Sequence, residues 1–485
     1  MRFLMYVFFG LLYLLILFLD RFYSSETIFL FKSLFLTLYI VTEILAVRME
    51  DRKNWMIKPV VLASVFTFLI GYGITNLRFI IPDSEARNNL FFTFGNDPFN
   101  LLSKTMDYIV LGLVSMWIGY RSNLGFFLFK FLTTSVVNLK KYFKNSFDFN
   151  IKLIYTFIIL SIGVRFYAIF IGVYGYAQDP EQVIESAGIS QYLNLLGLLA
   201  QYSLLVLSLA YYSEGQNKSY LKVIVLLIIV EVIFGIMSGM KSLVVMPFVI
   251  PMVAFFILKR KIKKSLLALS VAAIVIAYII IEPFRILRFM DPNFQSSPKY
   301  IIQTLYDAYI LNKQVGLGEA KDTEFFLFAF LSRNNYMIEA AMAIDYENNV
   351  GLNEHDPDFL SRLYFAPLHA VVPRFIWAGK PFENTGIWFT HRVLGFDFDS
   401  STGFTPFGFL YFAGGVPFIA LFFFIFGIMQ NALFRFLDLG SGGMIIFLGL
   451  LFTMVLIDTS VNGIFVAWIR YYPLLILIQY FTFKK

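Results

Sequence analysis

The chain of 485 residues is dominated by long apolar runs that contain few charges. The first run, residues 3–19, would form a helix of about 25 Å, close to the thickness of a bilayer's hydrocarbon core. Inside a bilayer every backbone amide needs a partner within the protein, so only helices and closed barrels can cross it. Because apolar residues here do not alternate with polar ones, the runs predict helices and exclude a β-barrel.

Twelve runs are candidate membrane spans. They cover residues 3–19, 28–47, 59–75, 101–120, 153–176, 191–212, 220–236, 243–258, 265–283, 404–429, 444–458 and 463–482. The first run is followed by Asp20-Arg21 and not by a small-residue cleavage site, so we interpret it as a retained helix and not as a signal peptide. The sequence therefore predicts an all-α integral membrane protein with about 12 transmembrane helices.

Composition supports this class and excludes others. Hydrophobic residues make up 59% of the chain and charged residues 15%, whereas soluble domains have about 45–50% and 25%. These values exclude a soluble enzyme, a disordered chain and a nucleic-acid binder. The chain contains no cysteine, which excludes disulfides, thiolate metal sites and a cysteine nucleophile.

Lysine and arginine are distributed unevenly between alternate connections. With the N-terminus in the cytoplasm, the cytoplasmic segments hold 21 of these residues and the short outer loops hold four. The opposite orientation would export the basic run from Lys259 to Lys264. The positive-inside rule therefore predicts that both termini are cytoplasmic.

Three regions follow from this topology. Residues 1–283 form a bundle of nine spans, residues 284–403 form one large extracytoplasmic loop with short helices, and residues 404–485 add three more spans. Long loops often carry function. This loop holds all three histidines of the chain, which are His355, His369 and His391.

A rigid basic turn lies within the large loop. In the segment 371–381, two prolines and a glycine interrupt the chain around Arg374, Trp377 and Lys380. Arginine offers a planar fork for phosphate oxygens and lysine a point charge, while tryptophan can stack on a sugar. The alternative is an interfacial anchor, with Arg374 and Lys380 reaching lipid headgroups.

Three more arginines of the loop are candidate anion ligands. Arg285 and Arg288 follow the ninth span, three residues apart, and would share one helical face. Headgroup contact is the alternative for this pair. Arg333 lies in an otherwise apolar stretch, and its alternative is a structural pair with Glu339 or Asp345.

Two arginines fall inside predicted spans. An intramembrane charge is costly and normally faces a cavity or a partner. Arg165 and Arg470 are these residues, and candidate partners at span ends are Glu231, Glu282 and Asp458. Arg165 would serve either a polyanion site or a structural ion pair.

Lys241 follows Ser238-Gly239-Met240 between two short spans. A turn of this composition can point amides at an anion, although an ordinary two-helix turn needs the same residues. No metal-ligand spacing, phosphate-binding glycine loop, dinucleotide fingerprint or nucleophile elbow is present. We therefore expect neither a metal nor a cofactor.

The whole pattern resembles the bacterial oligosaccharide repeat-unit polymerases, the Wzy-type O-antigen polymerases. The likeness runs from about Arg165 to Gly415 and rests on the late outer loop and on Pro373-Arg374-x-x-Trp377-x-x-Lys380-Pro381. The Arg165 helix, the turn at Lys241, Arg333-Asn334 and the segment 403–408 add to it. Some members carry an Arg-x10-Gly pattern in two outer loops, but eleven residues separate Arg374 from Gly386 and residues 177–190 contain no Lys or Arg.

The resemblance implies a membrane-integral glycosyltransferase with GT-C-like architecture in the bacterial inner membrane. Such enzymes transfer a glycan from undecaprenyl pyrophosphate to a sugar hydroxyl of another lipid-linked unit at the outer leaflet. Its implied partners are the undecaprenyl-pyrophosphate-linked oligosaccharide, membrane lipids and a chain-length regulator protein, with no nucleic acid. The products would be lipopolysaccharide, capsule or exopolysaccharide.

Roles can be assigned within this reading. Arg374, Arg333 and His391 are the expected catalytic residues, and Arg165, Lys380, Trp377, Arg285, Arg288 and Lys241 are the expected substrate ligands. His391 is the first candidate base because histidine can be neutral near pH 7, and Asp397 and His369 follow it. Two other functions stay open: a flippase or transporter of lipid-linked oligosaccharides, and an O-antigen ligase.

Overall fold

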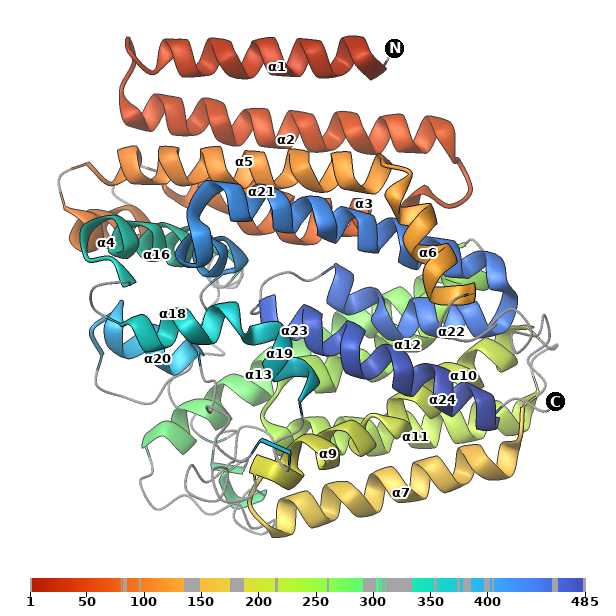
Figure 1. Cartoon of the computed structure of the whole chain (residues 1–485). Coiled ribbons are helices and arrows are strands. Elements are labelled where there is room, and N and C mark those ends of the chain that lie inside the picture. The colour runs from red at the N-terminus through yellow and green to blue at the C-terminus, as the bar shows by residue number, and fades with distance from the viewer. Residues whose placement is uncertain are drawn as a thin grey trace.

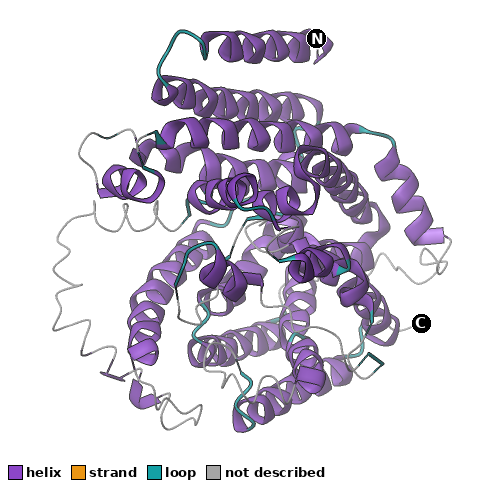
Figure 2. Cartoon of the chain, turned by 60° about the vertical axis from the view of Figure 1, so that its left-hand side comes forward, coloured by secondary structure: helices purple, strands orange, loops and turns teal. Residues whose placement is uncertain are grey.

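The computed structural model is built of helices. It describes residues 2–79, 81, 85–95, 97–134, 149–174, 187–213, 217–259, 261–290, 302–304, 306–307, 310, 334–352, 356–372, 376–377, 385–396, 402–403, 405–455 and 461–482. No β-strand occurs among these residues (Figure 2).

The first half of the chain contributes the following elements, of which η2 is a π-helix and η1 and η3 are 3₁₀-helices. They are α1 (Arg2–Leu19), α2 (Ser25–Glu50), η1 (Trp55–Ile57), α3 (Pro59–Ala63), η2 (Ser64–Gly73), η3 (Ile74–Phe79), α4 (Glu85–Phe94), α5 (Pro98–Arg121), α6 (Leu124–Thr134), α7 (Ile151–Phe170), α9 (Ala187–Gly197), α10 (Leu199–Ser213), α11 (Lys218–Ser238), α12 (Lys241–Lys259) and α13 (Lys264–Met290).

The second half continues in the same way, and here η8 is a π-helix. Its elements are α16 (Met337–Asn349), α18 (Pro357–Tyr364), α19 (Ala366–Val371), α20 (Thr385–Arg392), α21 (Pro406–Arg435), η6 (Phe436–Leu439), α22 (Gly440–Leu451), η7 (Phe452–Met454), α23 (Val461–Val466), η8 (Ala467–Tyr471) and α24 (Tyr472–Thr482).

Nine helices within the described residues are apolar and long enough to cross a membrane. One of them, Pro406–Met454, overlaps both predicted spans 404–429 and 444–458. The predicted spans 3–19 and 265–283 fall on the shorter apolar helices Leu4–Leu19 and Lys264–Ala277. The chain is thus an all-α, multi-pass membrane protein, and the count of twelve spans stays a prediction.

The helices lie roughly parallel to one another, with α1, α2 and α5 along one side and α7 and α11 along the other (Figure 1). The short helices α16, α18 and α20 gather at one end of the bundle, opposite the end that holds the C-terminus. All three short helices belong to the segment 284–403. Helix α13 continues past the predicted span end at residue 283 to Met290.

Helix starts follow from local sequence. Asp97 and Thr405 each cap a helix whose first residue is proline, and their side chains accept from the backbone N–H of Asn100 and Gly408. Proline suits the first helical position because its missing N–H would have no partner there. These two helices, α5 and α21, pack against each other along their length.

Buried ion pairs join helices at several places. Lys32 of α2 is 1% exposed and lies 2.7 Å from Asp107 of α5. Arg121 of α5 pairs with Glu43 of α2, whose side chain is fully buried. In a low-dielectric interior, removing one partner leaves an uncompensated charge and costs far more than replacing both by apolar residues. These pairs therefore favour the packing of α2 against α5.

Candidate functional site

The intramembrane arginine Arg165 is buried and paired. Both terminal nitrogens of its guanidinium donate to the carboxylate of Glu231 on α11, with Nη2 lying 3.1 Å from Oε2. The two side chains are 8% and 2% exposed. The ring of Phe234 lies beneath the guanidinium, 5.2 Å from its carbon to the ring centroid. Of the three acids that the sequence offered as partners, Glu231 is the one that holds Arg165.

A break between two helices completes this environment. Helix α9 ends at Gly197 and α10 begins at Leu199. The carbonyl of Gly197 accepts from Arg165 Nη2 and, at 2.7 Å, from Ser161 Oγ. A helix break inside a membrane leaves backbone groups that need new hydrogen-bond partners. Both donors to the Gly197 carbonyl, Arg165 and Ser161, come from α7.

Arg165 and Glu231 together line a cavity of about 250 Å³. The other polar side chains of its wall are Asn194 of α9, Gln201 of α10, Ser238 of α11, Tyr471 of η8 and Tyr174, which follows α7. Gln201 is notable because its buried Nε2 has no hydrogen-bond acceptor. A buried donor without an acceptor costs about 1–3 kcal/mol, so this wall is suited to an incoming acceptor group.

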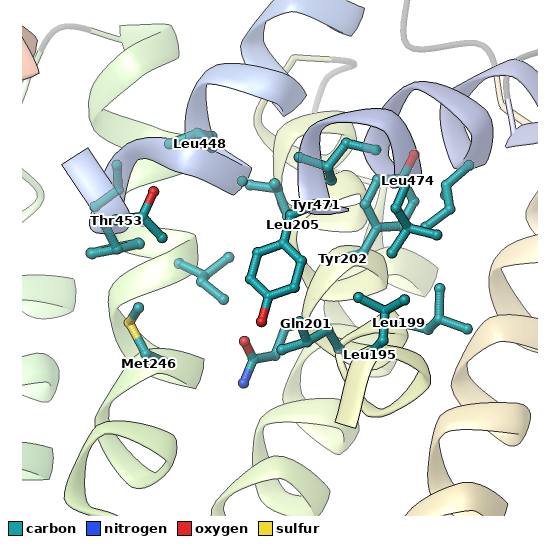
Figure 3. A pocket seen from close by; sticks show the side chains of 17 residues that line it. Leu195, Leu199, Gln201, Tyr202, Leu205, Met246, Leu448, Thr453, Tyr471 and Leu474 are labelled. Atoms are coloured by element: carbon teal, nitrogen blue, oxygen red, sulfur yellow. The ribbon is translucent and has the colours of Figure 1, made fainter. Parts of the chain in front are cut away.

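A second cavity, of about 220 Å³, adjoins the first and is mostly apolar. It is lined by leucines and other apolar side chains of α9, α10, α12, α22 and α24 (Figure 3). Leu198, Gln201 and Tyr471 line both cavities. Figure 3 shows Tyr471 entering from above and Gln201 facing it from below. The pair of cavities can therefore accept a ligand with one polar and one apolar part.

A separate cluster forms where α19 meets η8. Arg470, the second intramembrane arginine of the sequence, lies with Nη2 3.4 Å from the backbone oxygen of His369. His369 is 5% exposed, and its ring centroid is 5.2 Å from that of Trp377. The structure thus brings together Trp377, His369 and Arg470, and Arg470 is the chain neighbour of the cavity residue Tyr471.

The other predicted site residues have the following positions. His391 is exposed on α20. Lys241 is the half-buried first residue of α12 and follows Gly239, whose φ of +66° lies in the left-handed region. Arg285 and Arg288 lie on the last turns of α13. Arg333, Arg374 and Lys380 lie outside the described residues, so their convergence stays a prediction.

Sequence reasoning missed Gln201, Asn194 and Ser238 as lining residues. A signal for Gln201 existed, because it is an amide within the apolar run 191–212. The sequence offered Glu339 of α16 only as a partner for Arg333, and the structure shows that its Oε2 is buried without a hydrogen-bond donor. Burial raises the pKa of Glu339, and the nearby guanidinium of Arg78 lowers it by less.

Fold and site together define a multi-pass, all-α membrane protein with a polar and an apolar cavity side by side between its helices. Among the residues that the structure describes, no group of three or more His, Asp or Glu side chains could hold a metal ion. Comparison with models of protein families, with curated proteins and with solved structures finds no match. The functional argument therefore rests on the chain itself.

Proposed function

We propose that this protein polymerises oligosaccharide repeat units at the outer leaflet of the bacterial inner membrane. It would transfer the growing glycan from undecaprenyl pyrophosphate to a sugar hydroxyl of an incoming lipid-linked unit. The observation that carries the proposal is the pair of adjoining cavities. A lipid-linked donor has an anionic head and an isoprenoid tail, and the two cavities offer an arginine beside an apolar wall.

The chemistry requires stabilisation of a leaving anion. The acceptor oxygen forms a bond to the anomeric carbon as the bond from that carbon to the diphosphate oxygen breaks. The diphosphate leaves with the electron pair, and positioned cations stabilise the charge that develops on it. Arg165, with Arg333, Arg374 and Lys380 of the loop, is proposed to supply this stabilisation, and Trp377 to contact a sugar ring.

Filling the apolar cavity tests the proposal. Leu448 lines it and is 5% exposed, so Leu448→Trp should obstruct an isoprenoid chain and shorten or abolish the glycan ladder on a gel. Leu14→Trp is the matched control, because Leu14 is 61% exposed on α1 and faces outward. Leu448→Trp protein that is present in the membrane and gives a full ladder would refute the assignment of this cavity.

One observation favours the alternative of a transporter for lipid-linked oligosaccharides. Arg165 is already matched by Glu231, so the pair brings no net positive charge to the cavity for a leaving diphosphate. The two functions differ in their product. Loss of a polymerase leaves single repeat units at the outer leaflet, whereas loss of a flippase leaves them at the inner leaflet. An O-antigen ligase would use the same donor, and loss of it would leave polymerised glycan on the lipid carrier.

A further inference from the structure

The ion pair of Arg165 and Glu231 differs in position from the pair of Arg121 with the buried Glu43. Arg121 and Glu43 are packed between α1, α2 and α5, where Arg121 also donates to Tyr6. Arg165 and Glu231, in contrast, both line a cavity. A molecule that enters this cavity meets the carboxylate as well as the guanidinium.

Glu231 therefore competes with any anion for Arg165. Three of the five N–H donors of the guanidinium are engaged, two by Glu231 and one by the carbonyl of Gly197. An anionic head group can gain the two donors that face Glu231 only by displacing the carboxylate. The unpartnered Nε2 of Gln201 lies in the same wall, and it offers the entering anion one further donor that Glu231 leaves unused.

Displacement changes the chemistry of Glu231. While both terminal nitrogens of Arg165 donate to it, the carboxylate of Glu231 is engaged and points at the guanidinium. When an anion takes over these donors, the carboxylate oxygens can accept the hydrogen bond of a sugar hydroxyl that lies in the same cavity. Anion binding at Arg165 thus frees Glu231 as an acceptor beside the bound anion.

Building on the proposed function, we propose that Glu231 is the general base of glycan transfer and that the donor's diphosphate activates it by taking over Arg165. The acceptor hydroxyl oxygen bonds to the anomeric carbon, its proton passes to a carboxylate oxygen of Glu231, and the electron pair of the broken bond leaves with the diphosphate. When the diphosphate departs, Glu231 releases the proton and pairs with Arg165 again.

The other titratable groups that line the cavity do not suit this role. Arg165 cannot accept a proton, because a guanidinium has N–H donors and no acceptor atom. Tyr174 donates its hydroxyl to the backbone oxygen of Phe234 at 3.2 Å. Tyr471 enters from η8 and has a phenol, which is a proton donor near neutral pH. Glu231 is the carboxylate among the lining residues.

The experiment uses the full-length protein in proteoliposomes. Its substrate is the lipid-linked repeat unit extracted from cells that lack the protein, and the readouts are the initial rate of polymer formation between pH 5 and 8 and the apparent Kd for the donor. Glu231→Gln should lower the rate on the order of 100-fold or more. It should leave donor binding unchanged or tighter, because the competing carboxylate is gone, and the acidic limb of the pH–rate profile should disappear.

Glu43→Gln is the matched control, since it removes the charge of a buried, arginine-paired glutamate that lines neither cavity. It should keep the wild-type pH profile. A rate for Glu231→Gln within about threefold of the control, or an unchanged pH profile, overturns the proposal.

Glu231→Asp keeps the inference testable if the Gln variant does not fold. Aspartic acid is the stronger acid, so the acidic limb should move to lower pH, and an unmoved limb overturns the proposal. If wild-type protein forms no polymer from this substrate, the proposed function fails, whereas polymer formation that Glu231→Gln leaves unchanged overturns the role of Glu231 alone.

Discussion

The crossing of α5 and α21 sets a sharp test of the packing. Gly427 of α21 faces α5 so closely that a Cβ atom there would lie 2.0 Å from the backbone oxygen of Met116 and 2.7 Å from the nitrogen of Tyr120. Gly119 faces α21 in the same way, with its added Cβ 1.9 Å from the oxygen of Phe424. Small residues at a helix crossing allow such close approach in membranes.

Gly427→Ala should therefore force the two helices apart. The obstructing atoms belong to the backbone and cannot rotate away, so a contact of 2.0 Å must open by about 1.4 Å to reach the 3.4 Å of ordinary van der Waals contact. Overpacking costs about 1–3 kcal/mol, and we expect the upper end, about 3 kcal/mol, because the hydrogen bond from Asn431 to the oxygen of Tyr120 spans the same crossing.

The assay is thermal unfolding of the detergent-solubilised protein, followed by circular dichroism. Gly10→Ala is the control, because an added Cβ there meets nothing within 4 Å. Alanine in a helix is more favourable than glycine by about 0.5–1 kcal/mol, so this variant should be slightly stabilised. If Gly427→Ala unfolds at or above the wild-type temperature, the helix crossing described here is wrong.

Two further predictions concern function and pH. Arg374→Ala should abolish long-chain glycan while the protein stays in the membrane, and Arg374→Lys should restore the glycan only in part because the bidentate fork is lost. A normal glycan ladder from Arg374→Ala would show that Arg374 is an interfacial anchor. Arg21→Ala is the control, because Arg21 is exposed. Burial raises the pKa of Glu339 above its ordinary value of 4.5, so its contribution to stability should be complete below pH 4.5 and lost as the pH rises through the raised pKa. Glu339→Gln should remove this decline, and parallel wild-type and variant unfolding curves across pH would contradict it.

The helical class of this fold could be read from the sequence because the bilayer leaves few choices. An apolar run such as 153–176 has to satisfy its own backbone, so helix is the natural outcome, and α7 occupies most of that run. The helix type of the run 59–75 could not be predicted from the sequence. This run forms α3 and then the π-helix η2, and hydropathy carries no information about how tightly a helix is wound.

The site was less accessible to sequence reasoning. Arg165 stood out as a charge in an apolar run, and Glu231 was one of three offered partners. Choosing between them required knowing that α7 packs beside α11, which is a property of the whole bundle. The cavity wall depends on the break at Gly197, and no proline or charge in the run 191–212 marks that position.

Irregular backbone gives a second and independent indication of the site. A regular helix satisfies its own amides, so a break or a π-turn at membrane depth is tolerated only where protein or a cavity supports it. Two such irregularities meet at the polar cavity: the break after Gly197, whose carbonyl Arg165 binds, and the π-helix η8, whose last residue is Tyr471. They come from spans far apart in the sequence. Their convergence beside the ion pair of Arg165 and Glu231 implies that the cavity is maintained at the expense of helix regularity, as expected for a place where a ligand binds.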